Sequence, residues 1–259
     1  MRPARPHCGV GAGRLGAVTR VAAHLWALAP LGILIYVILA DRLSANPIED
    51  VTRRLGRDAL LMLTISLAVT PLVWLLERVA AHRGRGPARA RQRLASALRP
   101  LRRTFGLYAF FYASLHLFVF AVIDFGLDPG LLFDAALKKR YAFVGSTAFV
   151  ILMLLAVTST RGWVRRLGPT WRKLHRLVYV AAGLVVLHNL WAAKALTTGR
   201  LAWAALIAGL LLVRIPMWVA AGHRSAGPKT TAASQPAQSQ SGAGLSYDCQ
   251  NSSADSGRP

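Results

Sequence analysis

Six long apolar segments dominate this chain of 259 residues and restrict its fold more than any other feature. A helix that crosses a bilayer needs roughly 20 consecutive apolar residues, with about 17 to 25 tolerated. Five segments meet this requirement without a charged residue, and the sixth meets it if Arg214 extends its guanidinium to the membrane surface. These segments are residues 21–40, 59–76, 104–123, 141–160, 177–193 and 201–221. The sequence therefore predicts an all-α integral membrane protein, a bundle of six transmembrane helices.

The composition supports a membrane location, with 54% hydrophobic and 16% charged residues. The formal net charge of +22 also occurs in proteins that bind nucleic acid, but its distribution indicates a different cause. Basic residues exceed acidic ones in 1–20, 78–103 and 161–173, whereas 41–58 and 124–140 mix both signs. This alternation between successive loops follows the positive-inside rule. We therefore expect both termini in the cytoplasm and no binding to nucleic acid.

The chain divides into three parts by composition. Residues 1–20 form a basic cytoplasmic segment, and residues 21–221 form the six-helix domain. Residues 222–259 are rich in Ser, Ala, Gln, Gly and Pro and cannot bury a core, so a disordered cytoplasmic tail is expected. Before the third apolar segment, residues 88–98 are expected to form a short helix on the lipid surface. The sequence contains no nucleotide-binding glycine motif and no pair of C-x-x-C motifs that would indicate a soluble catalytic domain.

Two histidines lie deep inside apolar segments, where a polar ring is costly and indicates a function. His116 lies eight residues before Asp124, and His188 lies six residues before Lys194. At 1.5 Å per residue, the two rings lie about 12 Å and about 9 Å from the same end of two parallel helices. Because neutral imidazole is a common axial ligand of haem iron, the pair predicts a b-type cytochrome. The alternative is that both rings only form hydrogen bonds between helices.

Two further histidines match in depth near the opposite membrane face, His175 shortly after Lys173 and His24 shortly after Arg20. They are candidate ligands of a second haem, or interfacial rings in contact with water. Thirteen residues separate His175 from His188, which leaves them about 140° apart around an ideal helix. Either the fifth helix is distorted or the two rings face different partners. The other histidines, in polar or arginine-rich segments, are expected to be solvated: His7, His82 and His223.

Four stretches of the sequence carry a resemblance to a known family. They are ANPIEDVTRRLGRDAL at 45–60, LRRTFGLYAFFYASLHL at 101–117, LAVTSTRGWVRRLGPTWRKLHRLVYV at 155–180 and LHNLWAAK at 187–194. The chain resembles the MsrQ (YedZ) family, the haem-binding membrane subunits of the bacterial periplasmic methionine-sulfoxide reductase system MsrPQ, within the ferric-reductase-like transmembrane superfamily. The third stretch is a long signature, and the resemblance covers most of residues 20–215.

The resemblance implies an electron-transfer subunit of the bacterial inner membrane that is not itself catalytic. Such a subunit binds one or two b-type haems and FMN, and its haem core is that of the ferric-reductase-like superfamily. Its electrons come from the quinone pool or a cytoplasmic flavin reductase. They pass to a periplasmic molybdopterin enzyme, the partner in a heterodimer, which repairs oxidised methionine. The family's histidines correspond to His116, His175 and His188, and the histidine of the first helix corresponds to His24.

One position departs from the wider superfamily, whose third helix carries two histidines fourteen residues apart. Here the position fourteen residues before His116 is Arg102, which removes the usual inner partner of His175. Arg102 and Arg103 instead suit haem propionates or a flavin phosphate, because a guanidinium fork binds such anions. The sequence does not decide the number of haems, the FMN site or the electron donor.

Two other classes of protein share parts of this pattern. A self-standing ferric or quinone reductase would use the same haem core and would reduce iron without a periplasmic partner. A transporter or scaffold would use the histidines as proton relays or as helix contacts, and it would purify without haem.

Overall fold

The computed structural model describes residues 10–82, 88–192, 195 and 197–214, and every regular element in these residues is helical. Five helical segments are long and apolar enough to cross a membrane: Ala17–Leu39, Pro47–Ala80, Ala95–Ile123, Arg140–Val157 and Pro169–Trp191. The sixth predicted segment forms the shorter apolar helix α9 (Thr198–Leu212), which has 15 residues. The prediction of an all-α, multi-pass membrane protein is confirmed, with five full-length spans and this shorter helix in the described part of the chain.

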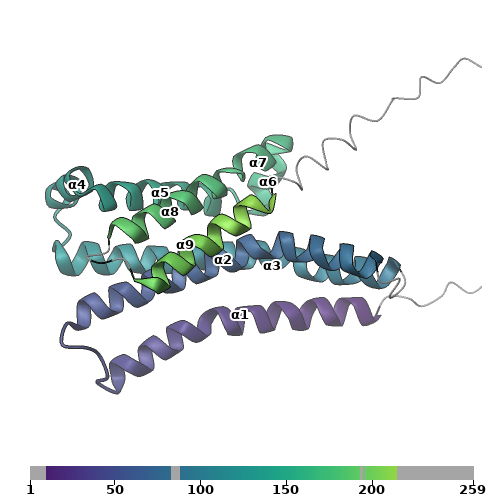
Figure 1. Cartoon of the computed structure of the whole chain (residues 1–259), viewed down its shortest axis with the longest axis horizontal. Helices are drawn as coiled ribbons and strands as arrows, with labels where there is room; N and C mark the ends of the chain where they lie inside the picture. Colours follow the sequence, from purple (N-terminus) through teal and green to yellow (C-terminus); the bar gives the residue numbers. More distant parts are fainter. Residues whose placement is uncertain (1–9, 83–87, 193–194, 196, 215–259) are drawn as a thin grey trace, which may run out of the picture.

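The long helices pack as neighbours along a common axis (Figure 1). α2 (Pro47–His82) packs most extensively on α3 (Ala88–Val119), and α5 (Arg140–Val157) packs on α8 (Leu177–Trp191). α1 (Val10–Leu39) lies against α3. Short helices connect these elements: η1 (Phe120–Asp124), α4 (Pro129–Lys138), α6 (Arg161–Leu167) and α7 (Pro169–Leu174). The start of α1, the end of α2, α6 and α7 lie toward one end of the bundle, and α4 lies toward the other.

α2 and α3 are longer than a bilayer requires. With 36 and 32 residues, they extend over about 54 Å and about 48 Å, whereas the hydrocarbon core is about 30 Å thick. Val69 and Val73 of α2 pack around Ala95 of α3 in a small separate core, with Leu98 and Leu101 against it. These contacts stabilise the extension. The separate surface helix predicted at residues 88–98 is instead the beginning of α3.

A proline inside α1 explains how this helix is attached to the bundle. Pro30 disturbs the ladder of backbone hydrogen bonds in α1, because proline lacks an N–H and its ring crowds the preceding turn. The hydroxyl of Tyr112 on α3 donates to the Ala27 carbonyl at 2.7 Å and accepts from the Leu31 N–H at 3.2 Å. Tyr112 is fully buried. Since backbone groups in a membrane need internal partners, Tyr112 fixes α1 to α3 at the proline.

A second proline determines the environment of Arg214. Pro71 lies inside α2 and lacks the N–H that would donate to the Leu67 carbonyl one turn earlier. Arg214 is only 3% exposed and donates to this carbonyl and to the Tyr179 hydroxyl. Its guanidinium carbon lies 4.8 Å from the centroid of the Tyr179 ring. The prediction that Arg214 reaches the membrane surface is therefore wrong, because its partners lie inside the bundle.

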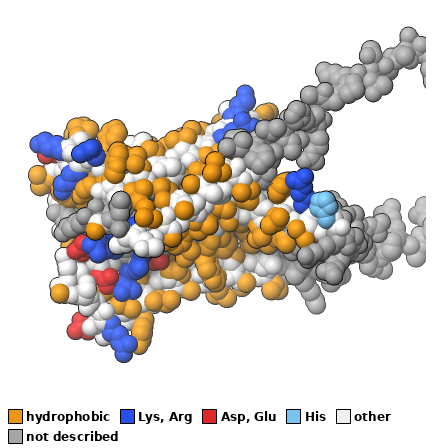
Figure 2. All heavy atoms as spheres, in the orientation of Figure 1, with side chains coloured by type: hydrophobic (Ala, Val, Ile, Leu, Met, Phe, Trp, Pro, Cys, Tyr) orange, Lys and Arg blue, Asp and Glu red, His pale blue; other side chains and the backbone are white. Residues whose placement is uncertain are grey.

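The surface has the polarity expected of a protein in a bilayer (Figure 2). Large apolar side chains such as Leu25, Val150 and Val180 are exposed along the helices. On the face shown in Figure 2, basic and acidic side chains gather toward the ends of the bundle, and the acidic ones lie at one end. His82 is exposed, as predicted, whereas His7, His223 and the predicted tail at 222–259 lie outside the described residues.

Candidate functional site

His116 of α3 and His188 of α8 lie next to each other inside the bundle. The centroids of their rings are 6.2 Å apart, and the ring planes meet at 84°. α3 and α8 run in the same direction, so the two rings reach the same depth (Figure 1). The structure therefore brings together the two histidines that the sequence assigned to one site.

Each of these rings is held by a backbone carbonyl from another helix. Nδ1 of His116 lies 2.9 Å from the carbonyl oxygen of Thr52 on α2. Nδ1 of His188 lies 2.8 Å from the carbonyl oxygen of Tyr141 on α5. A carbonyl can only accept a hydrogen bond, so Nδ1 carries the hydrogen in both neutral rings. Nε2 of each ring then retains its lone pair, which is the form that binds a metal.

The spacing of the two rings fits a metal bound between them. A metal lies about 2.0–2.1 Å from an imidazole nitrogen, and the ring radii on both sides bring the centroid separation to about 6 Å. The observed separation is 6.2 Å. The described residues contain no group of three or more His, Cys, Asp or Glu side chains that could hold a metal ion. With no third protein ligand among the described residues, His116 and His188 would hold haem iron rather than a metal ion bound by side chains alone.

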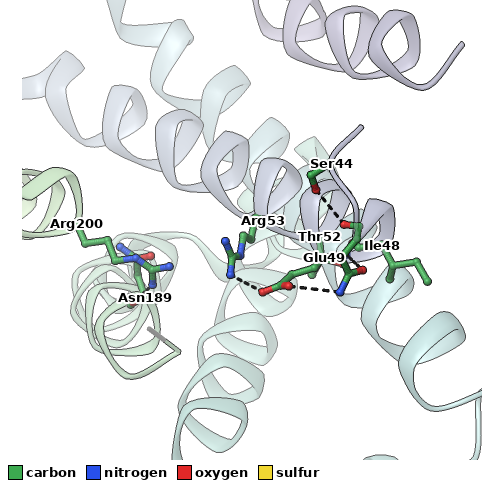
Figure 3. A network of polar contacts seen from close by, with 8 residues as sticks. Ser44, Ile48, Glu49, Thr52, Arg53, Asn189 and Arg200 are labelled. Atoms are coloured by element: carbon green, nitrogen blue, oxygen red, sulfur yellow. Dashed lines mark hydrogen bonds and ion pairs between the residues drawn. The ribbon is translucent and has the colours of Figure 1, made fainter. Parts of the chain in front are cut away.

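Polar contacts gather at the beginning of α2 and around Asn189 near the end of α8 (Figure 3). At the beginning of α2, Glu49 forms an ion pair with Arg53 one turn further on. Arg200 donates to the carbonyl of Asn189, the residue after His188, at 2.8 Å. Most charged residues of the predicted loop at 41–58 thus lie in the first turns of α2, where Glu49 pairs with Arg53 and Asp50 with Arg54.

His24 lies on α1 against Tyr108 of α3. Its Nδ1 lies 3.0 Å from the Tyr108 hydroxyl, and the two ring centroids are 5.7 Å apart. Tyr108 lies one turn before Tyr112, which fixes the same pair of helices at the Pro30 position. His175 lines a cavity described below, and His24 is not among the residues that line it. The structure therefore gives His24 a contact between α1 and α3, and a ligand role for His24 stays a prediction.

His175 lies at a break in the chain between two helices. α7 ends at Leu174 and α8 begins at Leu177, so the break lies just before the fifth predicted segment, which α8 forms as one continuous helix. The His175 ring stacks on Trp171 with centroids 4.0 Å apart, and its Nε2 lies 3.3 Å from the Ser159 hydroxyl oxygen. The distortion indicated by the thirteen-residue spacing is confirmed, and His175 and His188 face different surroundings.

A cavity of about 720 Å³ surrounds His175, between α2, α3, α5, α7 and α8. Its lining is rich in arginine and contains one acidic residue, Glu77, which pairs with Arg99 at 3.6 Å. Aromatic side chains of α2, α7 and α8 form part of the wall. The cationic and aromatic residues of this arginine-lined cavity are Arg99, Arg102, Arg103, Arg172, Arg176, Trp74, Trp171 and Tyr179. The charge favours an anion, and the aromatic walls favour a flat ring.

Sequence reasoning found Arg102, Arg103 and His175 in this cavity but missed the other lining residues. The signal was present in the spacing of the signature at 155–180. Trp171, Arg172, His175, Arg176 and Tyr179 recur every three to four residues, which is the spacing of one helical face. The contributions of α2 and α5 carry a weaker signal, because apart from Trp74 and Glu77 their lining residues are ordinary apolar and hydroxyl side chains.

Comparison with known proteins assigns the chain to a family. Residues 55–186 match the family described as ferric reductase like transmembrane component. The chain is 40% identical over 210 residues to the protein-methionine-sulfoxide reductase heme-binding subunit MsrQ of Ralstonia nicotianae, covering 79% of this chain and 88% of that protein. The chain belongs to the MsrQ family.

Two other MsrQ proteins show the same extent of similarity. The protein of Herminiimonas arsenicoxydans is 41% identical over 194 residues, covering 73% of this chain and 80% of the relative. The protein of Xanthomonas axonopodis pv. citri is 36% identical over 198 residues, covering 74% and 83%. Both relatives are named as heme-binding subunits. The segment that matches the ferric-reductase-like family contains His116 and His175 and ends two residues before His188.

Proposed function

We propose that this chain is the haem-binding membrane subunit of a bacterial methionine-sulfoxide reductase system, with a b-type haem held between His116 and His188. The observation that carries the proposal is the pair of rings 6.2 Å apart, each with Nδ1 against a backbone carbonyl. The names of the MsrQ relatives support it. When bound, haem supplies reversible one-electron oxidation and reduction at its iron.

The chain's own residues hold and orient this site. The Thr52 and Tyr141 carbonyls keep both rings in the neutral form with Nε2 free. Both rings are partly buried among the surrounding helices. No residue of the site is required to act as an acid, base or nucleophile. The protein thus conducts electrons, and the chemistry on methionine sulfoxide takes place in its partner.

The proposed electron path runs across the inner membrane, with both termini in the cytoplasm. Electrons enter from the quinone pool or a cytoplasmic flavin reductase and leave to a periplasmic molybdopterin methionine-sulfoxide reductase in a heterodimer. The basic residues of α6 and α7 lie at the end of the bundle that contains the start of α1 (Figure 1). By the positive-inside rule this end faces the cytoplasm, and α4 faces the periplasm. Reporter fusions in residues 83–87 and at Gly126 test this orientation, and a periplasmic signal from the first would reverse it.

The arginine-lined cavity is the proposed site of FMN, with Arg102 and Arg103 on its phosphate. Its volume of about 720 Å³ lies within the range of about 300–1,000 Å³ found for small-molecule sites. The second candidate for this cavity is another haem bound through His175, whose propionates would meet the same arginines. Haem and flavin released from the purified protein, each measured per polypeptide, distinguish the two occupants.

The deciding experiment is an absorption spectrum of the purified full-length protein, oxidised and reduced. We expect a reducible low-spin b-type spectrum that is lost in His116→Ala and in His188→Ala. His82→Ala is the matched control, since His82 is exposed at the end of α2 and should leave the spectrum unchanged. Colourless protein from haem-sufficient cells would falsify the proposal. Reduction of ferric chelates without any partner would favour the self-standing reductase.

A further inference from the structure

The two carbonyls that hold His116 and His188 share one local arrangement. The Thr52 carbonyl on α2 is followed four residues later by Gly56, and the Tyr141 carbonyl on α5 is followed four residues later by Gly145. In a helix the carbonyl of one residue lies next to the backbone of the residue four positions on. Each histidine therefore approaches its carbonyl across the backbone of a glycine.

The space at these glycines is occupied by the histidine rings themselves. A Cβ atom built on Gly145 would lie 2.5 Å from Nδ1 and 2.7 Å from Cε1 of His188. A Cβ atom built on Gly56 would lie 3.2 Å from Nδ1 and 3.3 Å from Cε1 of His116. The Cα–Cβ bond in a helix tilts toward the N-terminus, which is the direction of the carbonyl one turn earlier. Any side chain at these positions would cover the acceptor.

We propose that Gly56 and Gly145 are positioning residues for the two histidine ligands, an inference that rests on the proposed haem function. Each glycine exposes one helical carbonyl, and this carbonyl fixes both the orientation of the ring and the nitrogen that faces the metal. The hydrogen bond from Nδ1–H also makes Nε2 more electron-donating, which stabilises the oxidised iron. The glycines thereby set the redox balance of the site without touching the haem.

Substitution at the acceptor itself cannot test this role, because the acceptor is backbone. Replacing Thr52 or Tyr141 leaves a carbonyl in the same place. The glycines are therefore the positions at which a side chain can remove the hydrogen bond. The structure also predicts that a side chain at Gly145 disturbs its histidine more than one at Gly56. A Cβ atom at Gly145 would overlap the His188 ring, whereas at Gly56 the His116 ring would need to move by only a few tenths of an ångström.

A third carbonyl in the bundle shows the same arrangement with more room. The Ser66 hydroxyl donates to the Arg102 carbonyl at 2.8 Å, and Gly106 follows four residues after Arg102. A Cβ atom on Gly106 would lie 3.4 Å from the Ser66 oxygen, an ordinary contact. A small hydroxyl thus tolerates a methyl group where an imidazole ring does not. Of these three glycines, the two that face histidine leave less room for a Cβ atom than Gly106 does.

The test compares Gly145→Ala, Gly56→Ala and Gly183→Ala with the wild type in the full-length purified protein. Gly183 lies on α8 with His188, and a Cβ atom there would have no neighbour within 4 Å. We expect Gly145→Ala to bind haem roughly tenfold more weakly, the lower end of the effect of losing a partner of a metal-bound histidine. Gly56→Ala should keep haem but raise the ratio of reduced to oxidised haem at a fixed potential by up to about tenfold, or about 59 mV. Gly183→Ala should match the wild type.

Each outcome decides between specific alternatives. Wild-type spectra and potentials in both Gly145→Ala and Gly56→Ala would overturn the inference while leaving the haem function intact. Equal losses in Gly183→Ala and Gly145→Ala would also overturn it, since the effect would then reflect helix packing in general. If Gly145→Ala does not accumulate, the potential of Gly56→Ala decides. A colourless wild type would instead refute the proposed function.

Discussion

The surroundings of the histidines differ in kind between the two ends of the bundle. Around His116 and His188 the partners are neutral backbone carbonyls, which orient a ring without adding charge. Around His175 five arginines line a cavity with one acidic residue, so charge is the main attraction. A site defined by the direction of hydrogen bonds depends on sub-ångström geometry and little on salt. A site defined by exposed charge tolerates movement but weakens as ionic strength rises.

The largest expected effect separates the histidines of the two ends. His188→Ala should remove nearly all low-spin haem, because it removes one of the two imidazoles that would hold the haem iron. His175→Ala should keep the haem held by His116 and His188 and lower only total cofactor content or the rate of electron entry. Haem per polypeptide and the low-spin spectrum measure both. Equal and complete haem loss in the two variants would break the comparison, since both ends would then belong to one site.

A smaller effect is expected when the cavity loses charge. Arg102→Ala with Arg103→Ala should weaken FMN binding by roughly ten- to a hundredfold, the effect of losing about 1.5–3 kcal/mol of hydrogen bonding to a charged group. The residual binding should depend less on salt than that of the wild type. Flavin fluorescence titration at two ionic strengths measures both quantities. Arg140→Ala is the control, because Arg140 begins α5 away from the cavity, and an equal loss there would point to net charge alone.

The contact of Arg214 combines a charged side chain with a backbone carbonyl, since its guanidinium donates to the carbonyl of Leu67. Arg214→Met should destabilise the protein by about 1–3 kcal/mol, because a buried acceptor loses its donor. The variant Pro71→Ala with Arg214→Met should recover part of this loss, since alanine at this position restores the helical N–H. Thermal unfolding midpoints in detergent should fall by several degrees and then partly return. Simple additivity of the two substitutions would show that Pro71 and Arg214 do not share the carbonyl.

The smallest effect is expected at His24. His24→Phe keeps the ring volume and the packing on Tyr108 but removes the hydrogen bond between them, a contribution of about 0.5–1.5 kcal/mol. Haem content should stay within about twofold of the wild type, since the loss is confined to the contact between α1 and α3. Loss of one of two haems in this variant would instead make His24 the inner ligand that Arg102 cannot supply.

Much of the fold follows from the sequence because a membrane imposes few choices. Apolar segments of the required length become helices, and matched depth brings His116 to His188. The thirteen-residue spacing of His175 and His188 indicated either a distorted helix or different partners for the two rings, and the structure shows a break between α7 and α8. These features depend on length and period, which are properties of a single segment.

The features that the sequence did not predict depend on contacts between distant segments. Arg214 was expected at the surface because it lies late in the sixth apolar segment, and the Leu67 carbonyl becomes available only through Pro71 of another helix. Residues 88–98 continue α3 because Ala95 finds Val69 and Val73 on α2. The acceptors of His116 and His188 are carbonyls, which every residue carries and no residue type marks.

The proline in α2 also ties an early part of the chain to a late part during biosynthesis. Leu67 and Arg214 are 147 residues apart, so at about 5–20 residues per second the ribosome needs roughly 7 to 30 s to deliver the donor after the acceptor. Until then the kinked turn of α2 has a carbonyl that its own helix cannot satisfy. A chain released before Arg214 would therefore lack the donor that satisfies this carbonyl of α2.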